Sequence, residues 1–186
     1  GACSITTEWD GRFMMDLNYA YTRDLIRFSI RHEIPIVYAS SAAVYGNSAN
    51  FSEQSGNENP LNVYGYSKNM VDNFVARQLS SLKSQVIGLR YFNVYGPREQ
   101  HKGAMASVAF HLNRQLKESG KVRLFGSSHG MAAGEQRRDF IFVDDAVNTT
   151  LWFADHADCS GIFNCGTGRA ESFNELAEAV LDWHES

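Results

Sequence analysis

Hydrophobic residues near the start of the chain recur at regular intervals and then give way to a continuous apolar segment. Between residues 14 and 28 they recur every three or four positions, which is the spacing of one helix face. The run at 34–39, IPIVYA, is typical of a strand buried in a parallel sheet. The residues of the helical stripe are Met14, Leu17, Tyr21, Leu25 and Phe28.

The same alternation continues with a helix from about residue 64 and a second buried strand at 85–92. Helices that alternate with apolar strands predict an α/β fold built on a parallel sheet. The side chains that this second helix should direct inward are Val71, Phe74, Val75 and Leu79.

The second half of the chain repeats the pattern. Ser172 and Glu175 form a capping-box pattern for a final helix. A glycine-rich loop at 126–134 is the longest irregular stretch, so we expect it to be the most mobile. The other expected elements are a helix at 104–117, a strand at 139–143, a helix that opens at Asp144 and a strand at 161–165.

Composition narrows the possible functions. The 186 residues are 44% hydrophobic, enough for one ordinary globular domain. The net charge of -4 argues against a nucleic-acid partner or an anionic membrane surface, which would need a clustered basic excess. There is no long apolar run. The three cysteines lack paired metal-ligand spacing, so we expect reduced thiols in the cytoplasm, with neither a zinc site nor disulfides.

Candidate chemistry lies where the first strand ends and the next helix begins. Ser40 and Ser41 follow the 34–39 run, at the strand end where open α/β sheets bind their ligands. Tyr64 and Lys68 are four positions apart, so they share one helix face. To act as a base near neutrality, the tyrosine must lower its pKa from about 10, which requires about 4 kcal/mol. A lysine ammonium one turn away could supply part of that free energy. A lone Tyr-x-x-x-Lys also arises by chance, and the serine-bearing strand end is what favours chemistry.

Three motifs in this order and spacing, "SSAAVYG", "NPLNVYGYSK" and "LRYFNVYGP", resemble the extended short-chain dehydrogenase/reductase family of nucleotide-sugar epimerases and dehydratases. The resemblance implies an α/β fold with a Rossmann-like doubly wound parallel sheet and part of a smaller α/β substrate-binding region. It assigns residues 1–97 to the carboxyl side of the dinucleotide-binding domain. Residues 98–186 would be the substrate-binding region, interleaved with late Rossmann elements.

The family opens with a glycine-rich G-x-x-G-x-x-G turn, which does not occur in this sequence. The sequence also begins GACS, without an initiator methionine or a signal-peptide pattern. We therefore expect an internal part of a longer protein, inactive by itself. Gly166 and Gly168 lack a third glycine and are expected only to turn the chain.

By resemblance, Ser41, Tyr64 and Lys68 match the family's catalytic serine, tyrosine and lysine. Tyr64 would be the general acid/base, Ser41 would hold the substrate hydroxyl, and Lys68 would bind the nicotinamide ribose. Ser40 stands one position too early. The cofactor is expected to be NADP, with NAD also possible. The remaining cofactor contacts implied are Gly1, Ala2, Cys3, Ser4, Asn18 and Val94.

Within the family, "GACSITTEWDG", "YFNVYGPREQHKGAMASVAFH" and "GEQRRDFIFVDD" resemble the branch that epimerises carbon 6 of an ADP-linked heptose, a lipopolysaccharide precursor. That branch works by transient oxidation and hydride return, and Lys102 matches a second proton-handling lysine opposite Tyr64. Taken alone, Lys102 is a solvated loop charge and His111 a polar helix residue. The substrate contacts implied are Asn93, Ala104, His111, Phe125 and Arg138, with Ala104 acting through its backbone and Arg137 left facing solvent.

Several alternatives remain open. A dehydratase would have a Thr-Asp-Glu arrangement where this chain has Ser41-Ala42-Ala43, so it is disfavoured. A UDP-hexose 4-epimerase would not account for "TEWDG" or the "REQHKGAM" lysine. A non-catalytic nucleotide-binding scaffold is the alternative of another class. The resemblance also implies a homo-oligomer, a pentamer in the related epimerases.

Overall fold

The computed structural model describes residues 2–128 and 130–185. Its helices are α1 (Gly11–Met14), α2 (Tyr21–His32), α3 (Val63–Ala76), α4 (Val108–Ser119), α5 (Val143–Asp155) and α6 (Phe173–Glu185). A π-helix, η1 (Met15–Ala20), joins α1 to α2, and the 3₁₀ segments are η2 (Ala42–Val44), η3 (Leu79–Ser81) and η4 (Gln100–Met105). The strands are β1 (Ile36–Ser41), β2 (Val86–Tyr91), β3 (Asn93–Tyr95), β4 (Arg137–Phe142), β5 (Gly161–Cys165) and β6 (Ala170–Ser172).

By their contacts, these elements form two compact units. The first consists of the described residues up to Tyr91 together with Val147–Cys165. The second consists of Phe92–Ala146 and the described residues from Gly166 onward. Each unit therefore contains segments that are distant in sequence. The division of function at residues 97 and 98 remains a prediction.

The first unit contains the predicted parallel sheet, which is confirmed. Its strand order is β1-β2-β5, and both pairings are parallel. Tyr38 on β1 lies opposite Gly88 on β2, and a Cβ on Gly88 would stand 2.4 Å from the Tyr38 hydroxyl oxygen. Glycine at position 88 thus leaves room for the tyrosine ring to lie across the sheet.

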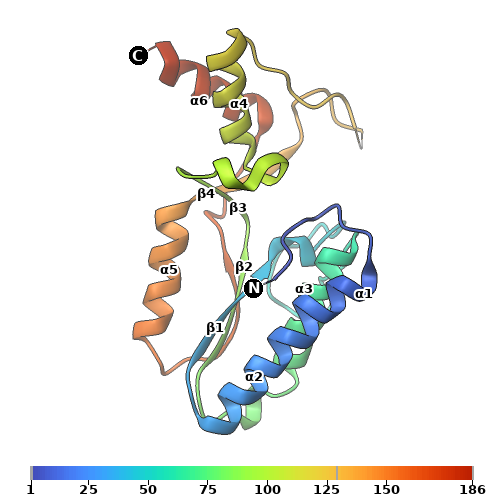
Figure 1. The fold of residues 1–186 in the computed structure, drawn as a ribbon, viewed down its shortest axis with the longest axis vertical. Coiled ribbons are helices and arrows are strands. Elements are labelled where there is room, and N and C mark those ends of the chain that lie inside the picture. Colours follow the sequence, from blue (N-terminus) through green and yellow to red (C-terminus); the bar gives the residue numbers. More distant parts are fainter. Residues whose placement is uncertain (1, 129, 186) are drawn as a thin grey trace. The chain divides into compact units, whose positions relative to one another are not determined.

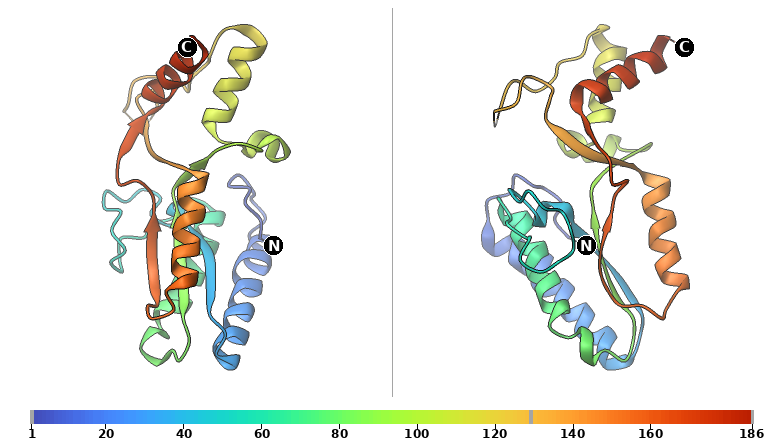
Figure 2. Two further views of the ribbon diagram at one scale, coloured as in Figure 1. Left: turned by 90° about the vertical axis from the view of Figure 1, so that its left-hand side faces the viewer. Right: turned by 180° about the vertical axis from the view of Figure 1, so that it is seen from behind.

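Helices cover both faces of this sheet (Figures 1 and 2): α2 and α3 lie on one face, and α5 from Val147 onward lies on the other. The core on the α2 and α3 side is a cluster of five buried residues. On the opposite side, Phe153 of α5 packs on Phe163 of β5 with ring centroids 4.9 Å apart. The residues of the five-membered cluster are Ile26, Tyr38, Val71, Val75 and Val86.

The first predicted helix is confirmed as the run α1, η1 and α2, but most of its apolar stripe is exposed. Leu17, Tyr21 and Leu25 are between 36% and 48% exposed. The side chains that this run buries include Asn18 and Ile26, both 0% exposed. The π-helical turn shifts which side chains face inward, and a sequence pattern that assumes 3.6 residues per turn does not include such a shift.

The second unit contains a small mixed sheet of order β3-β4-β6, in which β3 and β4 are parallel and β4 and β6 antiparallel. The capping box of α6 is confirmed: the Ser172 amide donates to Glu175 Oε2 over 2.6 Å, and the Glu175 amide to Ser172 Oγ over 3.1 Å. The expected helix start at residue 104 was wrong. Gly103 has non-helical angles (φ 55°, ψ -126°), and α4 begins only after its N-cap, Ser107.

Within the described ranges, none of the helices combines the length and the apolar character that crossing a membrane requires.

Candidate active site

Strand β1 and helix α3 bring Ser41, Tyr64 and Lys68 together in the first unit. Ser41 is the last residue of β1 and the N-cap of the 3₁₀ segment η2. Its Oγ accepts a hydrogen bond from the amide of Ala43. Asn62 caps α3 by accepting the Gly65 amide at 2.7 Å. This cap places Tyr64 in the first turn of the helix, where its hydroxyl lies near enough to Ser41 for the serine to affect the tyrosine pKa.

Lys68 lies one turn further along α3, and only 6% of its surface is exposed. Its Nζ is 5.9 Å from the centroid of the Tyr64 ring. Among residues 2–128 and 130–185 the ammonium donates one hydrogen bond, to the Ala39 carbonyl at 2.8 Å. An ammonium has three N–H donors, so two remain to bind a diol. This donor set fits the nicotinamide ribose that the sequence assigns to Lys68.

The protein groups alone do not lower the pKa of Tyr64. Burial raises that pKa, and the hydrogen bond from Ser41 only partly opposes the increase. Burial also lowers the pKa of Lys68, against the opposing charge of Asp72. Lys68 by itself therefore does not lower the tyrosine pKa, because a desolvated tyrosine favours its neutral form.

Asn18 connects the amino-terminal segment to helix α3. It is fully buried on the π-helix, where its Oδ1 accepts the Cys3 amide at 2.8 Å and its Nδ2 donates to the Cys3 carbonyl at 3.0 Å. The same Nδ2 donates to Ser67 Oγ at 3.1 Å, and Ser67 Oγ donates to the Tyr64 carbonyl at 2.7 Å. Asn18 thus fixes the backbone of Cys3, which the family resemblance assigns to the cofactor. Gly1, assigned in the same way, lies outside the described residues.

Ser67 is a site residue that the sequence analysis missed. It lies three positions after Tyr64 and one before Lys68, so the helix places it beside them. That spacing was the only sequence feature that could have indicated Ser67. Its hydrogen bond with Asn18 could not be predicted, because Asn18 is 49 residues away in sequence.

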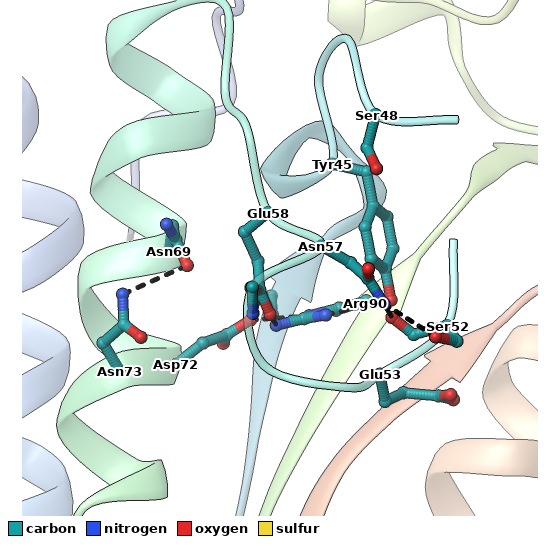
Figure 3. Close-up of polar contacts among 12 residues, drawn as sticks. Tyr45, Ser48, Ser52, Glu53, Asn57, Glu58, Asn69, Asp72, Asn73 and Arg90 are labelled. Atoms are coloured by element: carbon teal, nitrogen blue, oxygen red, sulfur yellow. Dashed lines mark hydrogen bonds and ion pairs between the residues drawn. The ribbon is translucent and has the colours of Figure 1, made fainter. Parts of the chain in front are cut away.

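A buried ionic network links α3 to strand β2 (Figure 3). Arg90 of β2, 2% exposed, donates from Nε to Asp72 of α3 at 2.8 Å and from Nη2 to Glu58 at 2.7 Å. Its Nη1 donates to the Tyr45 hydroxyl at 2.9 Å. Ser40 donates to the other side of Asp72 at 2.9 Å. Ser40 thus belongs to this network, whereas Ser41, the last residue of β1, lies near Tyr64 in the first turn of α3.

The predicted substrate residues lie in the second unit. Asn93 on β3 donates from Nδ2 to the Asp139 carbonyl of β4 at 3.2 Å. Its neighbour Val94 pairs with Ile141 in the same parallel ladder. Arg138 extends from β4 with its guanidinium 5.9 Å from the Phe173 ring, and Phe125 packs on that ring with centroids 5.1 Å apart.

A second group of predicted residues surrounds the start of α4. His111 Nε2 lies 3.3 Å from the Ala104 carbonyl, so these two residues are neighbours. Lys102, in the same loop, is paired with Glu99. Arg137 faces solvent as expected, and its guanidinium also donates to the Ala170 carbonyl and to Glu175.

Comparison with known proteins decides the family. The sequence profile described as "NAD dependent epimerase/dehydratase family" matches residues 6–166. The chain belongs to this family. It is 61% identical over 183 residues to ADP-L-glycero-D-manno-heptose-6-epimerase of Alkalilimnicola ehrlichii, a match that covers 98% of this chain and 57% of that protein.

Solved structures agree with this assignment. The crystal structure of ADP-L-glycero-D-manno-heptose-6-epimerase from Helicobacter pylori has a TM-score of 0.87 and 36% identity, over 98% of this chain and 56% of that one. UDP-N-acetylglucosamine 4-epimerase from Methanobrevibacter ruminantium has a TM-score of 0.80 and 26% identity, over 95% and 56%. The chain thus spans little more than half the length of these relatives.

Gly65 controls how closely α3 approaches η2, the segment that follows Ser41 in this epimerase/dehydratase chain. A Cβ on Gly65 would stand 2.5 Å from the Ala43 carbonyl oxygen, a backbone atom that cannot rotate away. In the full-length protein, Gly65→Ala is therefore expected to reduce the free energy of unfolding by about 1–3 kcal/mol, because the helix must shift. Urea denaturation measures this.

Asn73→Ala, at an exposed position of the same helix, is the matched control and should change stability by less than about 0.5 kcal/mol. A Gly65→Ala variant as stable as the wild type would mean that the close approach to Ala43 is not required.

Proposed function

We propose that the full-length protein converts ADP-D-glycero-D-manno-heptose to ADP-L-glycero-D-manno-heptose, in the supply of lipopolysaccharide heptose. The observation that carries this proposal is the grouping of Ser41, Tyr64 and Lys68, in a chain 61% identical to a protein named for that activity. Reduced cysteines and the low net charge suit a cytoplasmic enzyme. We also propose a homo-oligomer, pentameric like the related epimerases.

The chemistry follows from the substrate. Carbon 6 of the heptose bears a hydroxyl and is not adjacent to a carbonyl, so its C–H is too weakly acidic for direct proton removal. NADP, when bound, supplies a hydride acceptor and donor at this carbon. The protein then has to take up or return the hydroxyl proton on each face of carbon 6. We assign this proton transfer to Tyr64 for one orientation of the hydroxyl and to Lys102 for the other.

The remaining roles are assigned by the chemistry of the side chains. Ser41 would hold the reacting hydroxyl, and Lys68 the nicotinamide ribose. A planar guanidinium suits a pyrophosphate, so we assign Arg138 to the ADP phosphates, with the exposed Phe125 ring next to it on Phe173. Asn93, His111 and the Ala104 backbone would contact the sugar.

Isotope retention tests this proposal. The full-length protein, incubated with ADP-heptose that carries deuterium at carbon 6, is expected to give the epimer with the deuterium retained, as measured by mass spectrometry. Deuterium lost to solvent would contradict internal hydride return. Epimerisation of a UDP-hexose with no action on ADP-heptose would favour the UDP-hexose 4-epimerase alternative. Releasing the bound nucleotide from denatured protein distinguishes NADP from NAD.

A further inference from the structure

The loop between β3 and α4 is organised around one buried carboxylate, Glu99, which is 3% exposed. Its Oε1 accepts the Gly96 amide at 3.1 Å and the Ser107 hydroxyl at 2.7 Å. Its Oε2 accepts the Ser107 amide at 2.8 Å and lies 3.3 Å from Lys102 Nζ. Donors from both ends and the middle of the loop therefore converge on this one side chain.

Two of these donors fix the ends of the loop. Gly96 directly follows β3, and Ser107 is the N-cap of α4, whose Oγ accepts the Phe110 amide at 3.2 Å. Because the Ser107 hydroxyl donates to Glu99 while it accepts from Phe110, the carboxylate also orients the helix cap. The backbone in between is unusual, since Arg98 is a non-glycine residue in the left-handed region (φ 67°). Glu99 thus joins the two ends of a loop that contains this uncommon backbone conformation.

The third donor to Glu99 is Lys102, the candidate for the second proton-handling residue. The Lys102 side chain is 42% exposed while that of Glu99 is 4% exposed, so the pair has a buried anion and an accessible cation. Burial alone would raise the pKa of Glu99, but the hydrogen bonds from Ser107 and Gly96 and the charge of Lys102 outweigh it, so the pKa lies below its usual value. Glu99 is therefore ionised at neutral pH. One N–H of the ammonium points at Glu99, which leaves the others for a ligand.

Glu99 is not a residue that the sequence assigns to catalysis, and it need not touch the sugar. We propose that Glu99 is a positioning residue that holds the Lys102 ammonium in one place for the reaction at the sugar. This inference rests on the proposed function, because Lys102 acts on the substrate only if that function is correct. His101 is the neighbouring cation candidate, but its Nδ1 lies 3.0 Å from the Arg98 carbonyl and it has no carboxylate partner in the described loop.

A double-mutant cycle in the full-length protein separates positioning from a purely structural role. Glu99→Gln keeps the size but removes the charge and replaces one acceptor oxygen with an amide donor, and we expect kcat for ADP-heptose to fall about 10–100-fold with KM changed much less. Added to Lys102→Met, the same change should lower kcat no further. Glu99→Asp, which restores the charge, should recover part of the rate. Equal losses in both backgrounds, or an unchanged kcat, would overturn the proposal.

A spectroscopic readout keeps this test independent of turnover. Reductive methylation with carbon-13 keeps the lysine charge, and the Lys102 signal is identified by its absence in Lys102→Met. In Glu99→Gln that signal is expected to shift and sharpen, because the ammonium loses its fixed partner. An unchanged signal would refute the tether even if the protein had no activity on ADP-heptose, whereas a wild type that does not epimerise this substrate would refute the proposed function alone.

Discussion

Replacing Tyr64 with phenylalanine in the full-length protein is expected to reduce kcat for epimerisation by about 10²–10⁴-fold, the usual contribution of a general acid/base. The change removes only the hydroxyl that lies near Ser41. The ring stays, so its contact with Lys68 at 5.9 Å and the N-terminal turn of α3 are retained. Stability should change by about 1 kcal/mol, the worth of one hydrogen bond. Steady-state kinetics with ADP-heptose and urea denaturation measure the two effects.

Tyr66→Phe is the matched control. Tyr66 lies two positions further along the same helix and is 50% exposed, so it points away from the buried face that carries Ser67 and Lys68. The Tyr66→Phe variant should have the same kcat as the wild type. If Tyr64→Phe also epimerises at the wild-type rate, Tyr64 is not catalytic and the non-catalytic scaffold becomes the better interpretation.

The sequence predicted those features that short-range geometry determines. Tyr64 and Lys68 are one helical turn apart, so their approach required only that α3 be a helix. The Ser172 and Glu175 capping box is equally local. The parallel arrangement of β1, β2 and β5 followed from alternating helices and strands, because parallel neighbours need a crossover between them.

Contacts between residues distant in sequence could not be predicted in this way. Arg90 stands in an otherwise apolar strand, and nothing nearby indicates that its partners are Asp72 and Glu58. Nothing near Glu99 in the sequence indicates that it is buried, because its burial depends on how the loop closes on Ser107. The short strands β3 and β6 exist only because β4 pairs with both, and three residues carry too little pattern to reveal them.

Arg90→Met is expected to be the most destabilising of the substitutions considered, by about 3–5 kcal/mol in the full-length protein. Methionine fills much of the arginine volume, so the loss is mainly electrostatic. Burial raises the pKa of Asp72, and the charge and hydrogen bond of Arg90 act in the opposite direction. Without Arg90, Asp72 and Glu58 have to remain buried without their guanidinium, or Asp72 has to take up a proton. The loss of stability should therefore shrink as the pH falls.

Denaturation in urea at two pH values measures both effects. Arg77→Met, at an exposed arginine just after α3, is the control and should change stability by less than about 0.5 kcal/mol. Adding Asp72→Asn to Arg90→Met removes one of the stranded charges and should recover part of the loss, because a buried anion costs more than a buried amide. If Arg90→Met were as stable as Arg77→Met, the network would be dispensable, and the apolar contacts with Tyr38 and Val86 and the Lys68 bond to the Ala39 carbonyl would be enough to hold α3 on the sheet.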